Sequence, residues 1–227
     1  MNKLSKTAIL LFNQSEKQKA SLRKMAPKIS EQRLKSLIAQ LNCNAKKVCR
    51  KSGLPVFQVD ANGQENFGAQ LFQAYQRLFQ QGFDSVIGIS NDCPSFEALD
   101  VEKAAHAFQH NNLVLGPAKD GGLYLLGIQK NSISEAEFLA LPWQSGELHT
   151  GFQQLAVQHN WSVKELQSKA DMDTVKEFQI AFQSHFHFLI AFQNQLFSFS
   201  EQITNIFQTE LNLVVRRTRS LRAPPLV

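Results

Sequence analysis

The sequence VLGPAKDGGLYLLGI, residues 114–128, consists of two apolar segments joined by a glycine-rich turn. A carboxylate, Asp120, directly precedes the two glycines Gly121 and Gly122. Glycine adopts a positive φ without a steric penalty, so Asp-Gly-Gly predicts a tight turn between two buried strands. We expect Gly121 or Gly122 to have a positive φ or to lie where a Cβ would clash. An ordinary hairpin turn and a ligand-binding turn that carries Asp120 both fit this pattern.

A second apolar segment, residues 85–90, predicts a buried parallel strand that ends before Asn91 and Asp92. Ligands of open α/β sheets bind beyond the carboxyl ends of the strands. Asp92 is therefore expected at a ligand-binding edge, and the alternative is that it caps the helix after Pro94. We expect Cys93 to be a small buried side chain rather than a nucleophile.

Apolar periodicity and turn residues predict strands that alternate with helices. The expected strands are residues 7–12, 55–60, 85–90, 113–116, 123–128 and 161–166. The expected helices are residues 30–49, 67–82, 101–110, a short helix that Ser134 and Glu137 cap, and 147–159. This alternation is typical of a three-layer α/β fold with a mostly parallel sheet, and the Asp-Gly-Gly turn predicts one antiparallel strand.

The C-terminal part of the sequence differs in composition from the rest. Residues 178–215 are rich in Phe and Gln, and large apolar residues recur every three or four positions. This spacing predicts an amphipathic helical extension that packs on the preceding domain or associates with a second copy. Residues 216–227 are basic and proline-containing, so we expect a disordered tail. The predicted organisation is thus a domain at 1–177, an extension at 178–215 and a tail at 216–227.

Charge is distributed unevenly along the chain, although the net charge is only +5. Residues 1–53 contain 13 Lys and Arg against 2 acidic residues, whereas residues 54–215 contain 7 against 17. The basic part could face phosphates and the acidic part could hold a divalent cation, or both could be solvated helix surfaces. The three cysteines lack metal-ligand spacing, and no apolar run reaches 18 residues. A cytoplasmic location is expected.

Together these motifs resemble the GT-A-like nucleotide-sugar transferase superfamily. The matching order is strand, Asp-Cys-Pro, helix, strand, and then Gly-Pro-Ala-x-Asp-Gly-Gly-x-Tyr-Leu-x-Gly. The most similar branch is a bacterial family of unknown function, often labelled arsenosugar-biosynthesis or radical-SAM-associated glycosyltransferase, which is similar to the molybdenum-cofactor and phospholactate guanylyltransferases. Residues 67–68, 141–143 and 171–174 also match, so the resemblance covers about residues 6–180. The family's Lys-Thr-Arg-Leu element after the first strand is absent, and residues 21–24 are a partial counterpart.

The resemblance implies a metal-dependent glycosyltransferase with a nucleotide-sugar donor and Mg²⁺ or Mn²⁺ as cofactor. Asp92 and Asp173 would hold the metal ion, although Asp173 could equally cap a final helix. Asp120 would be the catalytic residue, because it could orient an acceptor hydroxyl or act as a base. The residues expected to bind nucleotide or substrate are Asn91, Asp92, Gly121, Gly122 and Gly68.

Two other functions remain open from the sequence. A nucleotidyltransferase of the same fold, similar to guanylyl- or cytidylyltransferases, would join a nucleoside triphosphate to a phosphorylated small molecule. A non-catalytic member would act as a binding or oligomerising module, which would agree with the missing Lys-Thr-Arg-Leu element. The expected partners are a nucleotide sugar or nucleoside triphosphate, a small-molecule acceptor and a second copy of the chain. Nucleic acid is not expected, because no stacking motif accompanies the basic segments.

Overall fold

The computed structural model describes residues 6–13, 31–61, 66–91, 93 and 95–169 of the 227-residue chain. The predicted metal ligands Asp92 and Asp173, the helical extension and the basic tail lie outside these residues. The predictions made for them therefore stay predictions.

Strands and helices alternate along the described chain, as the apolar pattern predicts. The strands are β1 (Thr7–Asn13), β2 (Val56–Asp60), β3 (Ser85–Ser90), β4 (Leu113–Pro117), β5 (Leu123–Gln129) and β6 (Val163–Glu165). The helices are α2 (Glu31–Lys51), α3 (Phe67–Gln80), α4 (Ala98–Ala107), α5 (Glu135–Ala140) and α6 (Leu148–Gln158).

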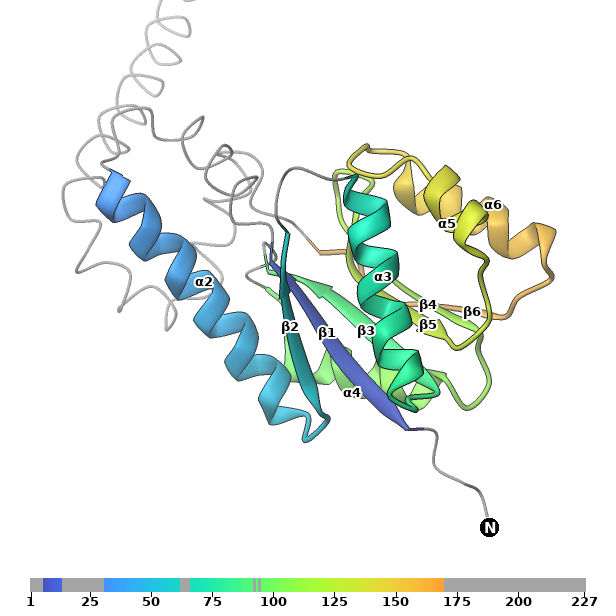
Figure 1. The fold of residues 1–227 in the computed structure, drawn as a ribbon, viewed down its shortest axis with the longest axis horizontal. Helices are drawn as coiled ribbons and strands as arrows, with labels where there is room; N and C mark the ends of the chain where they lie inside the picture. Colours follow the sequence, from blue (N-terminus) through green and yellow to red (C-terminus); the bar gives the residue numbers. More distant parts are fainter. Residues whose placement is uncertain (1–5, 14–30, 62–65, 92, 94, 170–227) are drawn as a thin grey trace, which may run out of the picture. The chain divides into compact units, whose positions relative to one another are not determined.

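The strands form one six-stranded sheet with the order β2-β1-β3-β5-β4-β6 (Figure 1). β1 is parallel to both β2 and β3, and β6 is parallel to β4. β5 is antiparallel to its neighbours β3 and β4, because the Asp-Gly-Gly turn reverses the chain between β4 and β5. The prediction of a mostly parallel sheet with one antiparallel strand is confirmed.

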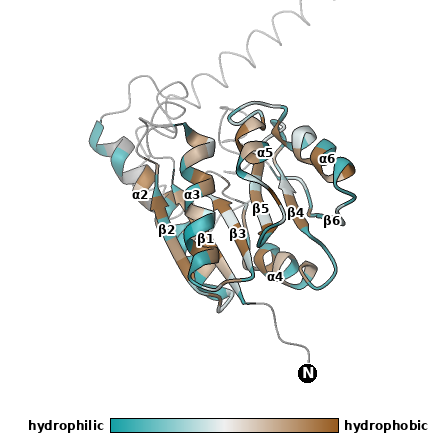
Figure 2. Ribbon diagram, turned by 45° about the vertical axis from the view of Figure 1, so that its right-hand side comes forward, coloured by the Kyte–Doolittle hydropathy of each residue, from teal (hydrophilic) through white to brown (hydrophobic). Residues whose placement is uncertain are grey.

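Helices cover both faces of the sheet because the central strands are apolar on both sides. On β1, Ala8, Leu10 and Phe12 pack in a core with α3, α5 and α6. The alternate residues Ile9 and Leu11 pack in a second core with α2 and α4. The result is the predicted three-layer α/β fold, in which mostly hydrophobic strands lie between helices that mix hydrophobic and hydrophilic residues (Figure 2).

Most boundaries lie within three residues of the predictions, and two differences have a clear structural cause. α4 begins at Ala98 rather than at residue 101, because Glu97 and Asp100 form a capping box that starts the helix earlier. β6 is shorter than the predicted segment 161–166, since only Val163–Glu165 pairs with β4. The predicted capping box of Ser134 and Glu137 is present at the start of α5.

The core beneath α2 and α4 contains two of the three cysteines. Cys49 and Cys93 are buried there, and Cys43 on α2 is exposed. Burial raises the pKa of the Cys49 thiol to about 12, so this side chain stays neutral and apolar in character. The expectation that Cys93 is a buried core residue is confirmed. None of the described helices combines the length and the apolarity that a membrane span requires.

The topology brings several chain segments to one edge of the sheet. From β1 the chain first adds β2 on one side, and β3 then pairs on the other side of β1. Such a reversal leaves a crevice beyond the carboxyl ends of the two strands, which is where ligands bind in folds of this kind. The carboxyl ends of β1, β3 and β4 and the start of β5 lie at this edge, because β5 alone runs the opposite way.

Candidate functional site

A cavity of about 210 Å³ lies at this edge of the sheet. Its walls come from the ends of β1 and β3, from α3, from β5 and from the loop before α6. The residues that line it are Phe12, Phe67, Leu71, Tyr75, Gly88, Ile89, Ser90, Asp120, Gly122, Leu123, Tyr124, Leu126, Trp143, Gln144, Ser145, Gly146 and Leu148. Asp120 supplies the charge in this lining, and the other described lining side chains are uncharged.

The Asp-Gly-Gly turn at the cavity is a three-residue hairpin loop with a glycine in the left-handed region. Gly121 N donates to Ala118 O at 3.1 Å, and Ala118 N donates to Gly122 O at 3.0 Å. Gly121 has a φ of +88°, the conformation that such a loop requires at its last position. The prediction of a positive φ at this glycine pair is confirmed at Gly121.

The backbone of this turn is held by the loop that precedes α6. A Cβ on Gly121 would lie 1.9 Å from Gly146 O, so the two segments touch at a point where no side chain fits. His149 N at the start of α6 donates to Gly121 O at 3.0 Å. Two independent contacts therefore fix the position of the turn against the loop.

The Asp120 carboxylate is oriented by its own turn. Gly122 N donates to Asp120 Oδ1 at 2.8 Å, which fixes the rotation of the side chain. The second oxygen, Oδ2, has no hydrogen-bond partner among the described residues, and Asp120 lines the cavity. One carboxylate oxygen thus holds the side chain in place and the other is available to a ligand.

Gly68 lies at the first turn of α3 and not in the lining of the cavity. Its N–H donates to Asn66 Oδ1 at 2.9 Å, where Asn66 caps the helix. The Trp143 ring occupies the space beside Gly68, because a Cβ there would lie 2.6 Å from Trp143 Cδ1. Packing of Trp143 against α3 accounts for a glycine at this position, and nucleotide binding by Gly68 stays a prediction.

A buried tyrosine forms part of the inner wall of the cavity. Tyr75 on α3 is 1% exposed, and its hydroxyl donates to Leu126 O of β5 at 2.6 Å. Burial raises the pKa of Tyr75, so the phenol remains protonated and keeps this bond. The hydroxyl thereby ties α3 to the sheet beneath the cavity.

Asn91, which follows β3, makes a contact with the helix on the other face of the sheet. Its side chain is buried, and its Nδ2 donates to Asn42 Oδ1 on α2. Binding of a ligand by Asn91 stays a prediction, and the described contact is with α2. Glu97 is the N-cap residue of α4. Asp92 lies outside the described residues, so both of its proposed roles, metal ligand and helix cap, stay predictions.

Lys169 is a residue of this edge that the sequence motifs did not reveal. Its Nζ donates to Ser95 O at 2.6 Å and lies 2.6 Å from Asp100 Oδ2. It also lies 5.7 Å from the centroid of the Tyr124 ring. Through its backbone, Lys169 pairs with Pro117 and Lys119 on the β4 side of the Asp-Gly-Gly hairpin. One residue therefore joins the loop after β3, through its side chain, to the hairpin that carries Asp120, through its backbone.

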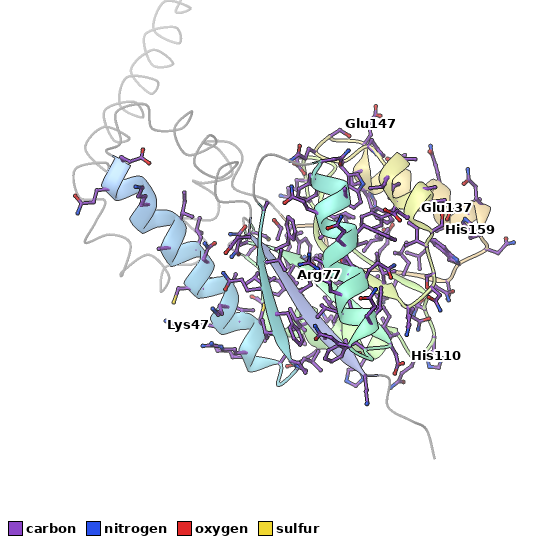
Figure 3. The ribbon with its side chains drawn as sticks, in the orientation of Figure 1. Lys47, Arg77, His110, Glu137, Glu147 and His159 are labelled. Carbon is purple, nitrogen blue, oxygen red and sulfur yellow. The ribbon has the colours of Figure 1, made fainter. Side chains whose placement is uncertain are left out.

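Two histidine–glutamate pairs lie beside α6. His149 Nε2 lies 3.0 Å from Glu165 Oε1, and Gln153 Nε2 donates to the same oxygen at 2.7 Å. Hydrogen bonds from Gln153 and His149 lower the pKa of Glu165. The second pair, Glu137 and His159, joins α5 to α6 at 2.5 Å, and Figure 3 shows the two side chains near each other at this end of the molecule.

Within residues 6–13, 31–61, 66–91, 93 and 95–169, no group of three His, Cys, Asp or Glu side chains is arranged to hold an ion. A hard cation such as Mg²⁺ takes about six oxygen ligands, and Asp120 supplies the single carboxylate of the cavity lining among these residues. The predicted ligands Asp92 and Asp173 lie outside the described part of the chain, so the metal site stays a prediction.

With this geometry established, the chain can be compared with known proteins. The family described as "Uncharacterized protein conserved in bacteria (DUF2064)" matches residues 26–145, which is more than half of the chain. The chain belongs to the DUF2064 family. The match includes the strand β3, the Asp-Gly-Gly turn and Trp143, so the DUF2064 region contains most of the cavity. A search of curated proteins finds no significant match.

Solved structures show which fold this DUF2064 protein has. A crystal structure described as a "putative nucleotide-diphospho-sugar transferase" from Desulfovibrio desulfuricans G20 has a TM-score of 0.72 at 20% identity, over 81% of this chain and 89% of that chain. The fold is therefore that of nucleotide-diphospho-sugar transferases, as the sequence motifs predict. A 4-diphosphocytidyl-2C-methyl-D-erythritol synthase from Anaerococcus prevotii DSM 20548 has a TM-score of 0.43 at 11% identity, over 78% of this chain and 97% of that chain. Rv0371C of Mycobacterium tuberculosis H37Rv, in complex with manganese, has a TM-score of 0.41 at 13% identity, over 79% and 99%.

Proposed function

We propose that this DUF2064 protein is a metal-dependent glycosyltransferase that moves a sugar from a nucleotide-sugar donor to a hydroxyl group. The observation that carries the proposal is the cavity beside Asp120 at the point where the strand order reverses, in a fold shared with nucleotide-diphospho-sugar transferases. The assignment to the arsenosugar-biosynthesis branch belongs to the same proposal and rests on the sequence motifs alone.

In this proposal the nucleoside diphosphate of the donor lies where the metal ligands Asp92 and Asp173 are predicted, and the acceptor hydroxyl lies at Asp120 Oδ2. The hydroxyl oxygen forms the new bond to the sugar C1, and the bond from C1 to the diphosphate oxygen breaks. The hydroxyl proton passes to the Asp120 carboxylate, and the nucleoside diphosphate leaves with the electron pair. Asp120 suits this role because Gly122 N fixes Oδ1 and directs the carboxylate before the substrate arrives.

The metal is proposed on the sequence positions Asp92 and Asp173. A divalent ion bound by these carboxylates would offset the negative charge that develops on the leaving diphosphate. Lys169 Nζ donates to Ser95 O at 2.6 Å and thereby stabilises the loop after β3.

The test is nucleotide binding by the wild-type protein and by Asp92→Ala, measured by calorimetry with and without Mn²⁺. Nucleoside diphosphates, nucleoside triphosphates and sugar nucleotides are compared. We expect Mn²⁺-dependent binding of a sugar nucleotide that Asp92→Ala abolishes while the thermal unfolding of the protein is retained. If Asp92→Ala bound the nucleotide with unchanged affinity in the presence of Mn²⁺, Asp92 would not be a metal ligand.

An assay of the reaction products, run beside the binding measurements, separates the alternatives. Release of pyrophosphate from a nucleoside triphosphate would identify a nucleotidyltransferase. Absence of nucleotide binding under all conditions would favour the non-catalytic alternative, in which the protein is a binding or oligomerising module. The missing Lys-Thr-Arg-Leu element is consistent with that alternative.

A further inference from the structure

We infer that the cavity beside Asp120 binds an uncharged, ring-sized apolar group of an alcohol, with the alcohol hydroxyl at Asp120 Oδ2. The inference rests on the proposed glycosyltransferase function in one respect, namely that the bound alcohol is the acceptor. The size, the lining and the charge of the cavity carry the rest.

The volume of the cavity fits one ring and not a large ligand. It measures about 210 Å³. An apolar protein cavity of about 150 Å³ holds benzene, whereas pockets for drug-sized ligands have about 300–1,000 Å³. The space therefore accommodates a six-membered ring with a short substituent.

The walls of the cavity are mainly apolar and partly aromatic. The rings of Phe12 and Phe67 lie with centroids 5.3 Å apart, and those of Phe67 and Trp143 lie 5.6 Å apart. Leu71 and Leu126 complete the lining between α3 and β5. Such apolar walls are unfavourably exposed to water. An apolar ring that displaces this water is therefore stabilised by the burial of both surfaces.

Charge excludes anionic groups from the same space. Asp120 is the charged residue of the described lining, and no described Lys or Arg side chain reaches the cavity. Asp120 is exposed to solvent, so its charge is partly screened. A phosphate or carboxylate beside it would still lie between apolar walls and a carboxylate of like charge, which disfavours its binding. A phosphorylated acceptor is therefore disfavoured, and a neutral alcohol is favoured.

A hydroxyl matches the polar group that the cavity offers. Asp120 Oδ1 is occupied by Gly122 N at 2.8 Å, and Oδ2 has no partner among the described residues. An ionised carboxylate oxygen only accepts hydrogen bonds, so it pairs with a donor such as O–H. The ligand is thus a ring that carries a hydroxyl group at its end.

The experiment measures binding of benzyl alcohol, toluene, glycerol and benzyl phosphate to the full-length protein. Saturation-transfer NMR and the fluorescence of Trp143, compared with Trp143→Phe, report the binding. We expect benzyl alcohol to bind at least about tenfold more tightly than glycerol or benzyl phosphate. No binding of benzyl alcohol, or equal binding of glycerol, would overturn the inference.

Three variants locate the ring and the hydroxyl. Leu71→Phe extends a lining side chain into the cavity and should weaken benzyl alcohol binding at least about tenfold, whereas Leu78→Phe on the same helix alters the core away from the cavity. Asp120→Asn keeps an acceptor for Gly122 N but removes the negative charge, so the charge-assisted hydrogen bond to the alcohol becomes a weaker neutral one. It should therefore weaken benzyl alcohol and leave toluene unchanged. Equal effects of Leu71→Phe and Leu78→Phe, or no effect of Asp120→Asn, would contradict the assignment.

Nucleotide binding, measured on the same samples, distinguishes this inference from the proposed function. Binding of benzyl alcohol without binding of any nucleotide would overturn the glycosyltransferase proposal and support the cavity assignment. Binding of a sugar nucleotide without benzyl alcohol would overturn the cavity assignment alone.

Discussion

Single residues of the Asp-Gly-Gly turn have separate physical tasks. Asp120 presents a carboxylate, Gly121 provides the left-handed backbone, and Gly122 donates the hydrogen bond that orients Asp120. The sequence predicted a turn and a positive φ here, because few residues other than glycine tolerate that conformation. It could not reveal Gly146 as the neighbour, since this contact depends on how a distant loop packs.

The first prediction compares the two glycines. Gly121→Ala should lower the free energy of unfolding by more than about 2 kcal/mol, because the left-handed region costs a residue with a Cβ about 1–2 kcal/mol and the new Cβ would overlap Gly146 O. Gly122→Ala is the matched control. Its Cβ would lie 3.1 Å from Asp120 Oδ1, and stability should stay within roughly 1 kcal/mol of wild type. Urea unfolding measures both, and equal losses would contradict the role assigned to Gly121.

At the level of helices and strands, local sequence signals were the most informative. The Ser134–Glu137 spacing predicted the start of α5, and the same residues form the capping box in the structure. The buried strands were recognisable as short apolar segments because both of their faces are covered. The start of α4 was predicted too late, since a capping box with Glu97 as its first residue does not follow the usual Ser or Thr pattern.

The second prediction concerns the pH dependence of the junction between α5 and α6. Hydrogen bonds from the Ser134 side chain and backbone, together with His159, lower the pKa of Glu137. A carboxyl group with a lowered folded-state pKa stabilises the fold above its unfolded pKa of about 4.3, and this stabilisation is lost as the pH falls through the folded value. Wild type should therefore have a higher melting temperature than Glu137→Gln at pH 7, and this difference should shrink as the pH is lowered below about 4.3.

Glu135→Gln is the control for this measurement. Glu135 lies in the same first turn of α5 and has no hydrogen-bond partner among the described residues. Its substitution should leave the melting temperature nearly unchanged at both pH values. A gap between wild type and Glu137→Gln that persists at low pH would show that the substitution acts through packing instead.

For the whole domain, the sequence predicted the fold class and one wall of the cavity. It identified the segments at the carboxyl edge, because strand ends and turn residues are local features. The other walls come from α3 and from the loop before α6, which only the strand order brings to the same place. Lys169 illustrates the limit, since its carbonyl partner Ser95 is 74 positions away in the chain.

The third prediction tests this long-range connection. The side chains of Lys169 and Asp100 are 12% and 8% exposed, so Lys169→Met should leave a nearly buried carboxylate without its cation. Removal of one partner from a buried pair costs about 3–5 kcal/mol, and we expect a loss of stability in this range.

A double-mutant cycle with Asp100→Asn separates the ion pair from the hydrogen bond to Ser95 O. The double variant should lose less than the sum of the single losses, by about 0.5–3 kcal/mol. Additive losses in chemical unfolding would mean that the two charges do not interact.

The two core cysteines have a practical consequence for spectroscopy. Cys49 and Cys93 are buried, and the pKa of about 12 at Cys49 keeps its thiol from forming the reactive thiolate. Cys43 is exposed on α2, so a maleimide dye or spin label should attach there without any engineered cysteine. Because Asn42, its neighbour in the chain, bonds Asn91 beyond β3, a label on Cys43 would sit one residue from the contact that links α2 to the ligand edge. The native chain thus carries its own site for an optical or magnetic reporter.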